Sequence, residues 1–353
     1  MGSESIEASF LSIFALISFF IFLIISKYSD KIKNGVLLDN DFSKPQAFHD
    51  SPITRSGGIA AIISLSVFFG IHYLLYSKFL LEYFLIGFSM FFVGFLDDLK
   101  INIKPFKRLL LMIFLLSAII FLLPIKIYNI DIPFLTFLFK SHFVSSIFIL
   151  LCFLFVINGA NLIDGFNGLL AINLIIINII LVYINLNNAN LEFSLLIISQ
   201  IIILLSFLLF NFPKAKMFLG DSGAYLMGSL IALNIIITNN LNPNIPSFFF
   251  CTLLFYIFFE VFFSFFRKLL QNKSPIYPDQ KHLHMLSFYK ISLIFGKDKG
   301  NFLNSLIVNF VYLILIIPGL YFINSPILSR YWFFAVLLIY VLIYSRLYRL
   351  TKN

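Results

Sequence analysis

Long apolar stretches alternate with short polar segments along the whole chain. Most of these stretches approach the roughly 20 apolar residues that a helix needs to cross the core of a bilayer. They lack the alternation of apolar and polar positions that is typical of a transmembrane β-barrel. The pattern therefore predicts an all-α, polytopic integral membrane protein with about eleven transmembrane helices, ten being the alternative number. The predicted spans are residues 8–26, 57–76, 79–96, 107–124, 143–157, 168–186, 192–211, 221–238, 247–266, 302–321 and 331–347.

Composition supports this class. Hydrophobic residues make up 60% of the 353 residues and charged residues only 12%, with a mean hydropathy of +0.99, which excludes a water-soluble domain of this length. The first span follows Glu4 and Glu7 and has no basic leader, so we expect a retained helix rather than a cleaved signal. The chain is interpreted as a single transmembrane domain covering 1–353.

The basic residues predict how the chain lies in the membrane. If the N-terminus is outside and the C-terminus cytoplasmic, 21 of the 25 Lys and Arg residues fall in inner segments, as the positive-inside rule requires. The net charge of +9 then belongs mainly to one face, where it would attract anionic lipid head groups and phosphorylated ligands. We expect no nucleic-acid partner, because no soluble domain is predicted.

The polar clusters that could carry chemistry all fall in five of these inner segments, which are about 27–56, 97–108, 158–167, 212–220 and 267–300; the sixth inner segment is the C-terminal stretch 346–352. A random distribution would place polar clusters on both faces. The pattern instead predicts one inner-facing site built from several loops. The clusters read KPQAFHDSPITRSGG (44–58), FLDDLK (95–100), NGANLIDGFNG (158–168), FLGDSG (218–223) and PDQKHLH (278–284).

Two of these clusters place carboxylates at span ends. Asp97 and Asp98 are adjacent, and they repel each other unless a cation or a proton intervenes. Asp221 lies between glycines, which let a ligand or a helix approach the backbone closely. The alternatives are a solvated helix end for the pair and a helix cap for Asp221.

In the third cluster, polar side chains recur every three residues: Asn158, Asn161, Asp164 and Asn167. On a helix or a 3₁₀ turn such residues can point together. The accompanying glycines weaken regular helix, and irregular backbone at membrane depth is tolerated where it is buried in protein or lines a watery cavity. Asparagine contacts between helices are the alternative interpretation.

Three acidic positions without a nearby cysteine suit a hard cation bound by oxygen. Mg²⁺ fits best, because it binds one or two carboxylates and shares its other positions with water and phosphate. Zinc would need more His or Cys. His282 and His284 could both reach a phosphate from a loop, or one could act as a general acid, or either could be a surface residue.

These motifs together resemble the polyprenyl-phosphate N-acetylhexosamine-1-phosphate transferase family. The resemblance runs from about residue 44 to 284. Asp97-Asp98-Leu99-Lys100 is similar to the paired aspartates of the family, and residues 158–169 to its asparagine-rich element. Residues 218–223 resemble the block with the metal-binding aspartate, and residues 278–284 resemble the histidine loop.

The resemblance implies transfer of a sugar-1-phosphate from a UDP-sugar to a membrane polyprenyl phosphate, with release of UMP. It implies Mg²⁺, with Mn²⁺ as a substitute, bound mainly by Asp221 with Asp97 and Asp98 close by. It also implies a cytoplasmic-membrane enzyme with its site facing the cytoplasm, and a homodimer is a possible assembly.

The resemblance further implies a role for each candidate substrate-binding residue. Asn158, Asn161, Asp164 and Asn167 would line the donor site, with Asn161 and Asp164 facing the nucleoside. Phe218 would stack on uracil. His282 and His284 would contact the donor phosphates or the sugar, and Arg55 would be a further phosphate contact.

Some residues depart from the family pattern. Asn167 stands where many bacterial members have Asp, and Met285 interrupts the run of histidines. Glu260, followed by Arg267 and Lys268, is similar to the branch that starts O-antigen and wall teichoic acid synthesis, which we favour over the muramoyl-pentapeptide translocase branch.

Two other function classes would show different sequence patterns. A transporter of an anionic solute would show repeated halves and charged sites near the midplane. A Mg²⁺-dependent membrane prenyltransferase would carry two elements with several Asp each. Neither pattern is seen in the sequence.

Overall fold

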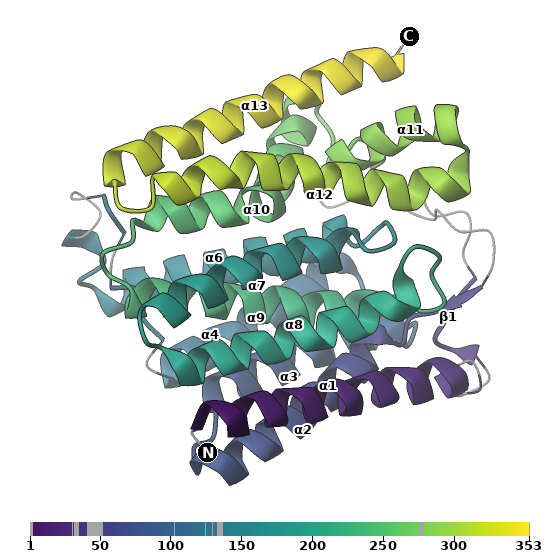
Figure 1. Ribbon diagram of the computed structural model, residues 1–353. Coiled ribbons are helices and arrows are strands. Elements are labelled where there is room, and N and C mark those ends of the chain that lie inside the picture. Colours follow the sequence, from purple (N-terminus) through teal and green to yellow (C-terminus); the bar gives the residue numbers. More distant parts are fainter. Residues whose placement is uncertain are drawn as a thin grey trace.

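The computed structural model describes residues 3–29, 31, 35–40, 52–101, 103–123, 125–128, 130–132, 137–274 and 279–352. Helices run roughly along one direction in a bundle, with α1 and α2 at one edge and α12 and α13 at the other (Figure 1). The helices are α1 (Ser3–Tyr28), α2 (Gly57–Tyr76), α3 (Leu81–Asp98), α4 (Pro105–Leu122), α6 (His142–Ile163), α7 (Leu169–Asn187), α8 (Leu191–Asn211), α9 (Gly220–Leu241), α10 (Ser247–Leu270), α11 (Leu283–Phe295), α12 (Lys297–Tyr321) and α13 (Pro326–Lys352).

Each of the eleven predicted spans coincides with one of these helices, so the all-α membrane fold is confirmed. Within the described part of the chain, ten helices are long and apolar enough to cross a membrane. The one predicted span outside these ten is 79–96, which is α3. It is too charged to count as membrane-spanning, because Glu82, Asp97 and Asp98 place three carboxylates in its 18 residues. The direction in which the helices cross stays a prediction.

Two elements lie where loops were expected. The short helix α11 occupies part of the 267–300 segment. A small hairpin, β1 (Leu38–Asp39) and β2 (Ile53–Thr54), pairs antiparallel with Leu38 opposite Thr54. At the last residue of β2, the Thr54 carbonyl accepts the Phe218 N–H at 2.8 Å. The hairpin is thereby joined to the chain just before α9.

Helix α9 forms the centre of the bundle. In its most apolar window 83% of the residues are buried, compared with 22% for α1, and it packs most extensively on α3 and α6. Such a helix can carry small and polar residues, because its neighbours satisfy them. The Asn234 amide, for example, donates to Asn178 at 3.1 Å and to Gln200 at 2.7 Å. Burial of α9 fixes the position of its first residues, which include Asp221.

Candidate active site

A pocket of about 930 Å³ lies where the ends of several helices meet. It receives residues from the C-terminal ends of α3 and α6, the N-terminal ends of α4 and α9, and the sides of α10. Nine of the eleven predicted site residues line it, so most of the clusters expected at one site lie together. These nine are Arg55, Asp97, Asn158, Asn161, Asp164, Asn167, Phe218, Asp221 and His282.

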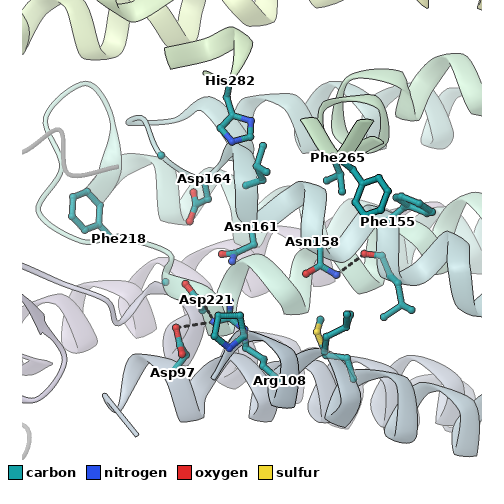
Figure 2. A pocket seen from close by; sticks show the side chains of 18 of the residues that line it. Asp97, Arg108, Phe155, Asn158, Asn161, Asp164, Phe218, Asp221, Phe265 and His282 are labelled. Atoms are coloured by element: carbon teal, nitrogen blue, oxygen red, sulfur yellow. Dashed lines mark hydrogen bonds and ion pairs between the residues drawn. The ribbon is translucent and has the colours of Figure 1, made fainter. Parts of the chain in front are cut away.

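At one wall of the pocket, Arg108 joins two carboxylates. Its Nη1 lies 2.8 Å from Asp97 Oδ2 and 2.8 Å from Asp221 Oδ2, as Figure 2 shows. The guanidinium also lies over the ring of Tyr225, 5.6 Å from its centroid. A single cation therefore holds Asp97, from the end of α3, against Asp221, from the start of α9.

Asp98 does not line the pocket. It is buried, and its carboxylate accepts the N–H groups of Asp221 at 3.0 Å and Ser222 at 2.9 Å. These are two of the donors that a helix start leaves without partners, and a carboxylate there also suits the helix dipole. Gly220 has φ +75°, and a Cβ on it would lie 2.7 Å from Asp98 Oδ2. The sequence Gly220-Asp221 thus lets α9 begin directly on Asp98.

Arg55 enters the pocket from β2. Its Nη2 lies 2.7 Å from Asp39 Oδ2, and its Nη1 lies 3.9 Å from Asp98 Oδ1. Burial works against its charge, but the carboxylates of Asp221 and Asp39 outweigh burial and raise the pKa of Arg55 above its ordinary value. The pocket therefore keeps a second permanent cation beside the carboxylates.

The asparagine-rich segment points into the pocket as its spacing predicted. Asn158 and Asn161 lie on the last turns of α6, which ends at Ile163, while Asp164 and Asn167 follow in turns. Asn167 is held by its N–H, which donates to Asn301 Oδ1 at 2.8 Å, and by its amide, which donates to the Pro213 carbonyl at 2.9 Å.

Asp164 sits on the pocket wall, and among the described residues no Lys or Arg forms an ion pair with it. Burial and the negative charges of Asp221 and Asp98 raise its pKa well above the ordinary value. A buried carboxyl group with a raised pKa lies in surroundings that disfavour its charged form, and such groups are typical of functional sites.

The two predicted histidines lie in different environments. His282 lines the pocket, whereas His284 is buried behind it, with the two rings nearly parallel and 5.6 Å apart. His284 Nδ1 lies 3.2 Å from the Tyr256 hydroxyl. Burial lowers the pKa of His284 to about 3, so its ring is neutral at physiological pH.

Sequence reasoning missed several residues of this pocket. Arg108, which joins Asp97 to Asp221, was not among the predicted site residues. Lys268, Asp39, Asn211 and Asn301 also line the pocket. Lys268 was noted only for its place after Glu260. Asp39, Asn211 and Asn301 carry no motif, because they come from segments that reach the site only through the packing of the bundle.

The far side of the pocket is apolar. Figure 2 shows Phe218 at one end, Phe155 and Phe265 at the other, and Asn161, Asp164 and Asp221 between them. The apolar side is made by α4, α6 and α10, which supply Met112, Leu151, Phe155, Phe262, Phe265 and Phe266. Phe265 and Phe266 are also exposed, at 44% and 47%. The polar end of the pocket is therefore continuous with an apolar surface of membrane helices.

The metal prediction can be tested against the donor set. Among the described residues, no group of three or more His, Cys, Asp or Glu side chains could by itself hold a metal ion. Asp97 and Asp221 turn their Oδ2 atoms toward one place, where both contact Arg108. Two carboxylates fit Mg²⁺, because this ion completes its shell with water and phosphate.

Comparison with known proteins agrees with the geometry. The profile of glycosyl transferase family 4 matches residues 80–239, which contain Asp97, Asp164 and Asp221. An undecaprenyl-phosphate alpha-N-acetylglucosaminyl 1-phosphate transferase of Thermotoga maritima is 26% identical over 281 residues, 78% of this chain and 80% of the relative.

Two further relatives carry different names. A probable undecaprenyl-phosphate N-acetylglucosaminyl 1-phosphate transferase of Bacillus subtilis is 26% identical, over 67% of this chain and 66% of the relative. A phospho-N-acetylmuramoyl-pentapeptide-transferase of Dictyoglomus thermophilum is 30% identical, over 61% of this chain and 70% of the relative. The resemblance drawn from the motifs is thus confirmed, and the protein is a membrane-embedded enzyme that belongs to glycosyl transferase family 4.

Proposed function

We propose that this enzyme transfers an N-acetylhexosamine-1-phosphate from a UDP-sugar to undecaprenyl phosphate, giving a polyprenyl-diphosphate-linked sugar and UMP. The observation that carries the proposal is the two-sided pocket. Its polar end holds carboxylates beside Arg55, Arg108, Lys268 and His282, and its other end is apolar. A charged nucleotide and a lipid phosphate could meet there while the lipid tail stays among α4, α6 and α10.

The names of the relatives support this reaction in general. They support UDP-GlcNAc as the first donor to test. We propose a site that faces the cytoplasm in the cytoplasmic membrane, since 21 of the 25 basic residues lie in the segments assigned to that face. The product would start an envelope glycan such as O-antigen or teichoic acid.

The reaction joins two polyanions, so it depends on charge neutralisation and alignment. An oxygen of the acceptor phosphate attacks the β-phosphorus of the donor, the bond from this phosphorus to the bridging oxygen breaks, and UMP leaves. Mg²⁺ bound by Asp97 and Asp221 would neutralise phosphate charge. Arg55 and His282 would contact the transferred phosphate.

The remaining residues of the site would bind and orient the donor. Asn161 and Asp164 lie on the wall where the nucleoside would rest, and the ring of Phe218 offers a stacking surface for uracil. Asn158 and Asn167 supply amides to the same wall. Asp98 would act through Asp221, because it holds the start of α9 rather than the pocket.

The test is UMP release by the purified protein in detergent with undecaprenyl phosphate, Mg²⁺ and a panel of UDP-sugars. We expect release that needs the lipid, one donor and Mg²⁺, and that stops with EDTA. Pyrophosphate release from a prenyl diphosphate would instead identify a prenyltransferase. A folded protein that releases no UMP with any donor, beside an active control enzyme, would reject the proposal.

A further inference from the structure

A buried carboxylate lies directly behind the pocket. Glu260, on α10, is 1% exposed and does not itself line the pocket. Three donors from other parts of the chain converge on it. Its Oε1 accepts from His282 Nδ1 at 3.0 Å and from the Leu283 N–H at 3.1 Å, and its Oε2 accepts from the Tyr340 hydroxyl.

This arrangement fixes the orientation of the His282 ring and the position of a proton on it. A carboxylate can only accept hydrogen bonds, so Nδ1, the nitrogen that faces Glu260, carries a proton and donates it. The same carboxylate holds the first N–H of α11, which begins at Leu283. Ring and helix start are thereby fixed together. Figure 2 shows the ring extending from this helix start toward Asp164.

The other side of the ring is also supported. Asp279 Oδ1 lies 3.4 Å from His282 Nε2. The Asp279 carboxylate is in turn held by both terminal nitrogens of Arg267, at 2.8 and 3.1 Å. Rotation of the ring is thereby blocked. Because phosphate and carboxylate oxygens both accept, Nε2 would donate to a phosphate in the doubly protonated form of the ring.

We infer that Glu260 is a positioning residue for the transfer reaction: it orients His282 and keeps a proton on Nδ1, so that the Nε2 edge of the ring faces the phosphates in the pocket. The inference deepens the proposed function and rests on it. Carboxylates commonly orient a functional imidazole in this way through its second nitrogen.

The competing explanation is that Glu260 only joins α10, α11 and α13. The two explanations differ in whether the effect of Glu260 passes through His282. A double-mutant cycle separates them, because residues that act through one another give non-additive losses. Glu260→Gln keeps the shape of the side chain, and His282→Gln keeps a donor toward position 260.

We would measure kcat/KM for UMP release in the wild type, in Glu260→Gln, in His282→Gln and in the double variant. We expect Glu260→Gln to lower kcat/KM roughly 10- to 100-fold, the range seen when a residue that orients a histidine is lost. In the His282→Gln background the same change should cost less than about twofold.

Two further variants distinguish a specific effect of Glu260 from a general loss of folding. Tyr340→Phe removes one donor to Glu260 and should give a smaller loss that also disappears in the His282→Gln background. Tyr344→Phe is the control, since the Tyr344 hydroxyl donates to the Lys281 carbonyl at 3.0 Å and ties α13 to the same loop, whereas Glu260 accepts from His282, Leu283 and Tyr340. It should keep wild-type kcat/KM. Melting in detergent checks that each variant folds.

Equal losses from Glu260→Gln in both backgrounds would overturn the inference, as would a fully active Glu260→Gln enzyme. Either result leaves the proposed function intact, because the wild type would still release UMP. A wild type that releases no UMP with any donor rejects the proposed function itself, and the inference with it.

Discussion

At the scale of single residues, Asp221 is the side chain on which the chemistry should depend most. Its Oδ2 shares Arg108 Nη1 with Asp97, and its place at the start of α9 is fixed by Asp98. We expect Asp221→Asn to lower kcat for UMP release by at least about 100-fold, as loss of a preorganised charge in an active site does. The fold should persist, because Asn has the same shape.

The control for this variant is Glu192→Gln, which removes a carboxylate near Lys78, away from the pocket. It should keep wild-type turnover. Normal turnover by a folded Asp221→Asn enzyme would show that the carboxylate of Asp221 takes no part in the transfer.

Asp164 gives a prediction about stability and pH. Its pKa is raised in the folded protein by burial and by Asp221 and Asp98, so ionisation costs the folded state free energy. This cost is absent below the ordinary value of about 4 and grows as pH rises toward the raised value. We expect Asp164→Asn to melt at a higher temperature than the wild type at pH 8, with the difference shrinking toward pH 4.

Thermal melts in detergent without substrate, at pH 4, 6 and 8, would measure this difference. The activity of Asp164→Asn should fall, since a strained carboxyl group is retained for function rather than stability. A stability gain that is the same at every pH would contradict the assigned cause.

Which polar residues reach the site was only partly predictable. Successive residues on a helix point about 100° apart. One member of the Asp97-Asp98 pair therefore faces the pocket and the other faces α9, and the sequence does not say which. His282 and His284 divide in the same way. The residues spaced by three, from Asn158 to Asn167, were predictable because this spacing keeps side chains on one side.

At the scale of elements, the contact between α3 and α9 sets the position of the carboxylates. A Cβ on Gly94 would lie 2.4 Å from the backbone carbonyl of Asp221. We expect Gly94→Ala to push the two helices apart, to destabilise the protein by about 1–3 kcal/mol, and to reduce UMP release by moving Asp221. Melting and kcat together would test this.

Gly70→Ala is the matched control, because a Cβ there would have no neighbour within 4 Å. Alanine also favours helix over glycine by up to about 1 kcal/mol, so this variant should be neutral or slightly more stable. Equal behaviour of the two alanine variants would mean that close packing at Gly94 does not position α9.

The elements themselves were predictable where one physical requirement dominates. A bilayer demands long apolar helices with internally satisfied backbone, and all eleven predicted spans are helices. The hairpin and α11 were not predictable, because distant partners stabilise them. β2 is held through the bond from Phe218 to Thr54, and α11 begins on the carboxylate of Glu260.

At the scale of the whole molecule, the orientation in the membrane decides which side supplies the nucleotide. Helix α8 offers a direct test, because its 21 residues span roughly 30 Å and its two ends carry exposed positions. Lys214 follows its C-terminal end, and Asn188 precedes its N-terminal end. The charge distribution assigns Lys214 to the cytoplasmic side and Asn188 to the outside.

We therefore expect an impermeant thiol reagent to label Asn188→Cys in intact cells, and Lys214→Cys only after the cells are opened. Cys152 and Cys251 would first be replaced by Ser, so that each variant has one thiol. The two positions flank one helix, and labelling of Lys214→Cys in opened cells shows that its thiol is reactive, so its protection in intact cells reports the side of the membrane. Labelling of Lys214→Cys from outside would reverse the orientation and would place the pocket at the surface where UDP-sugars are not made.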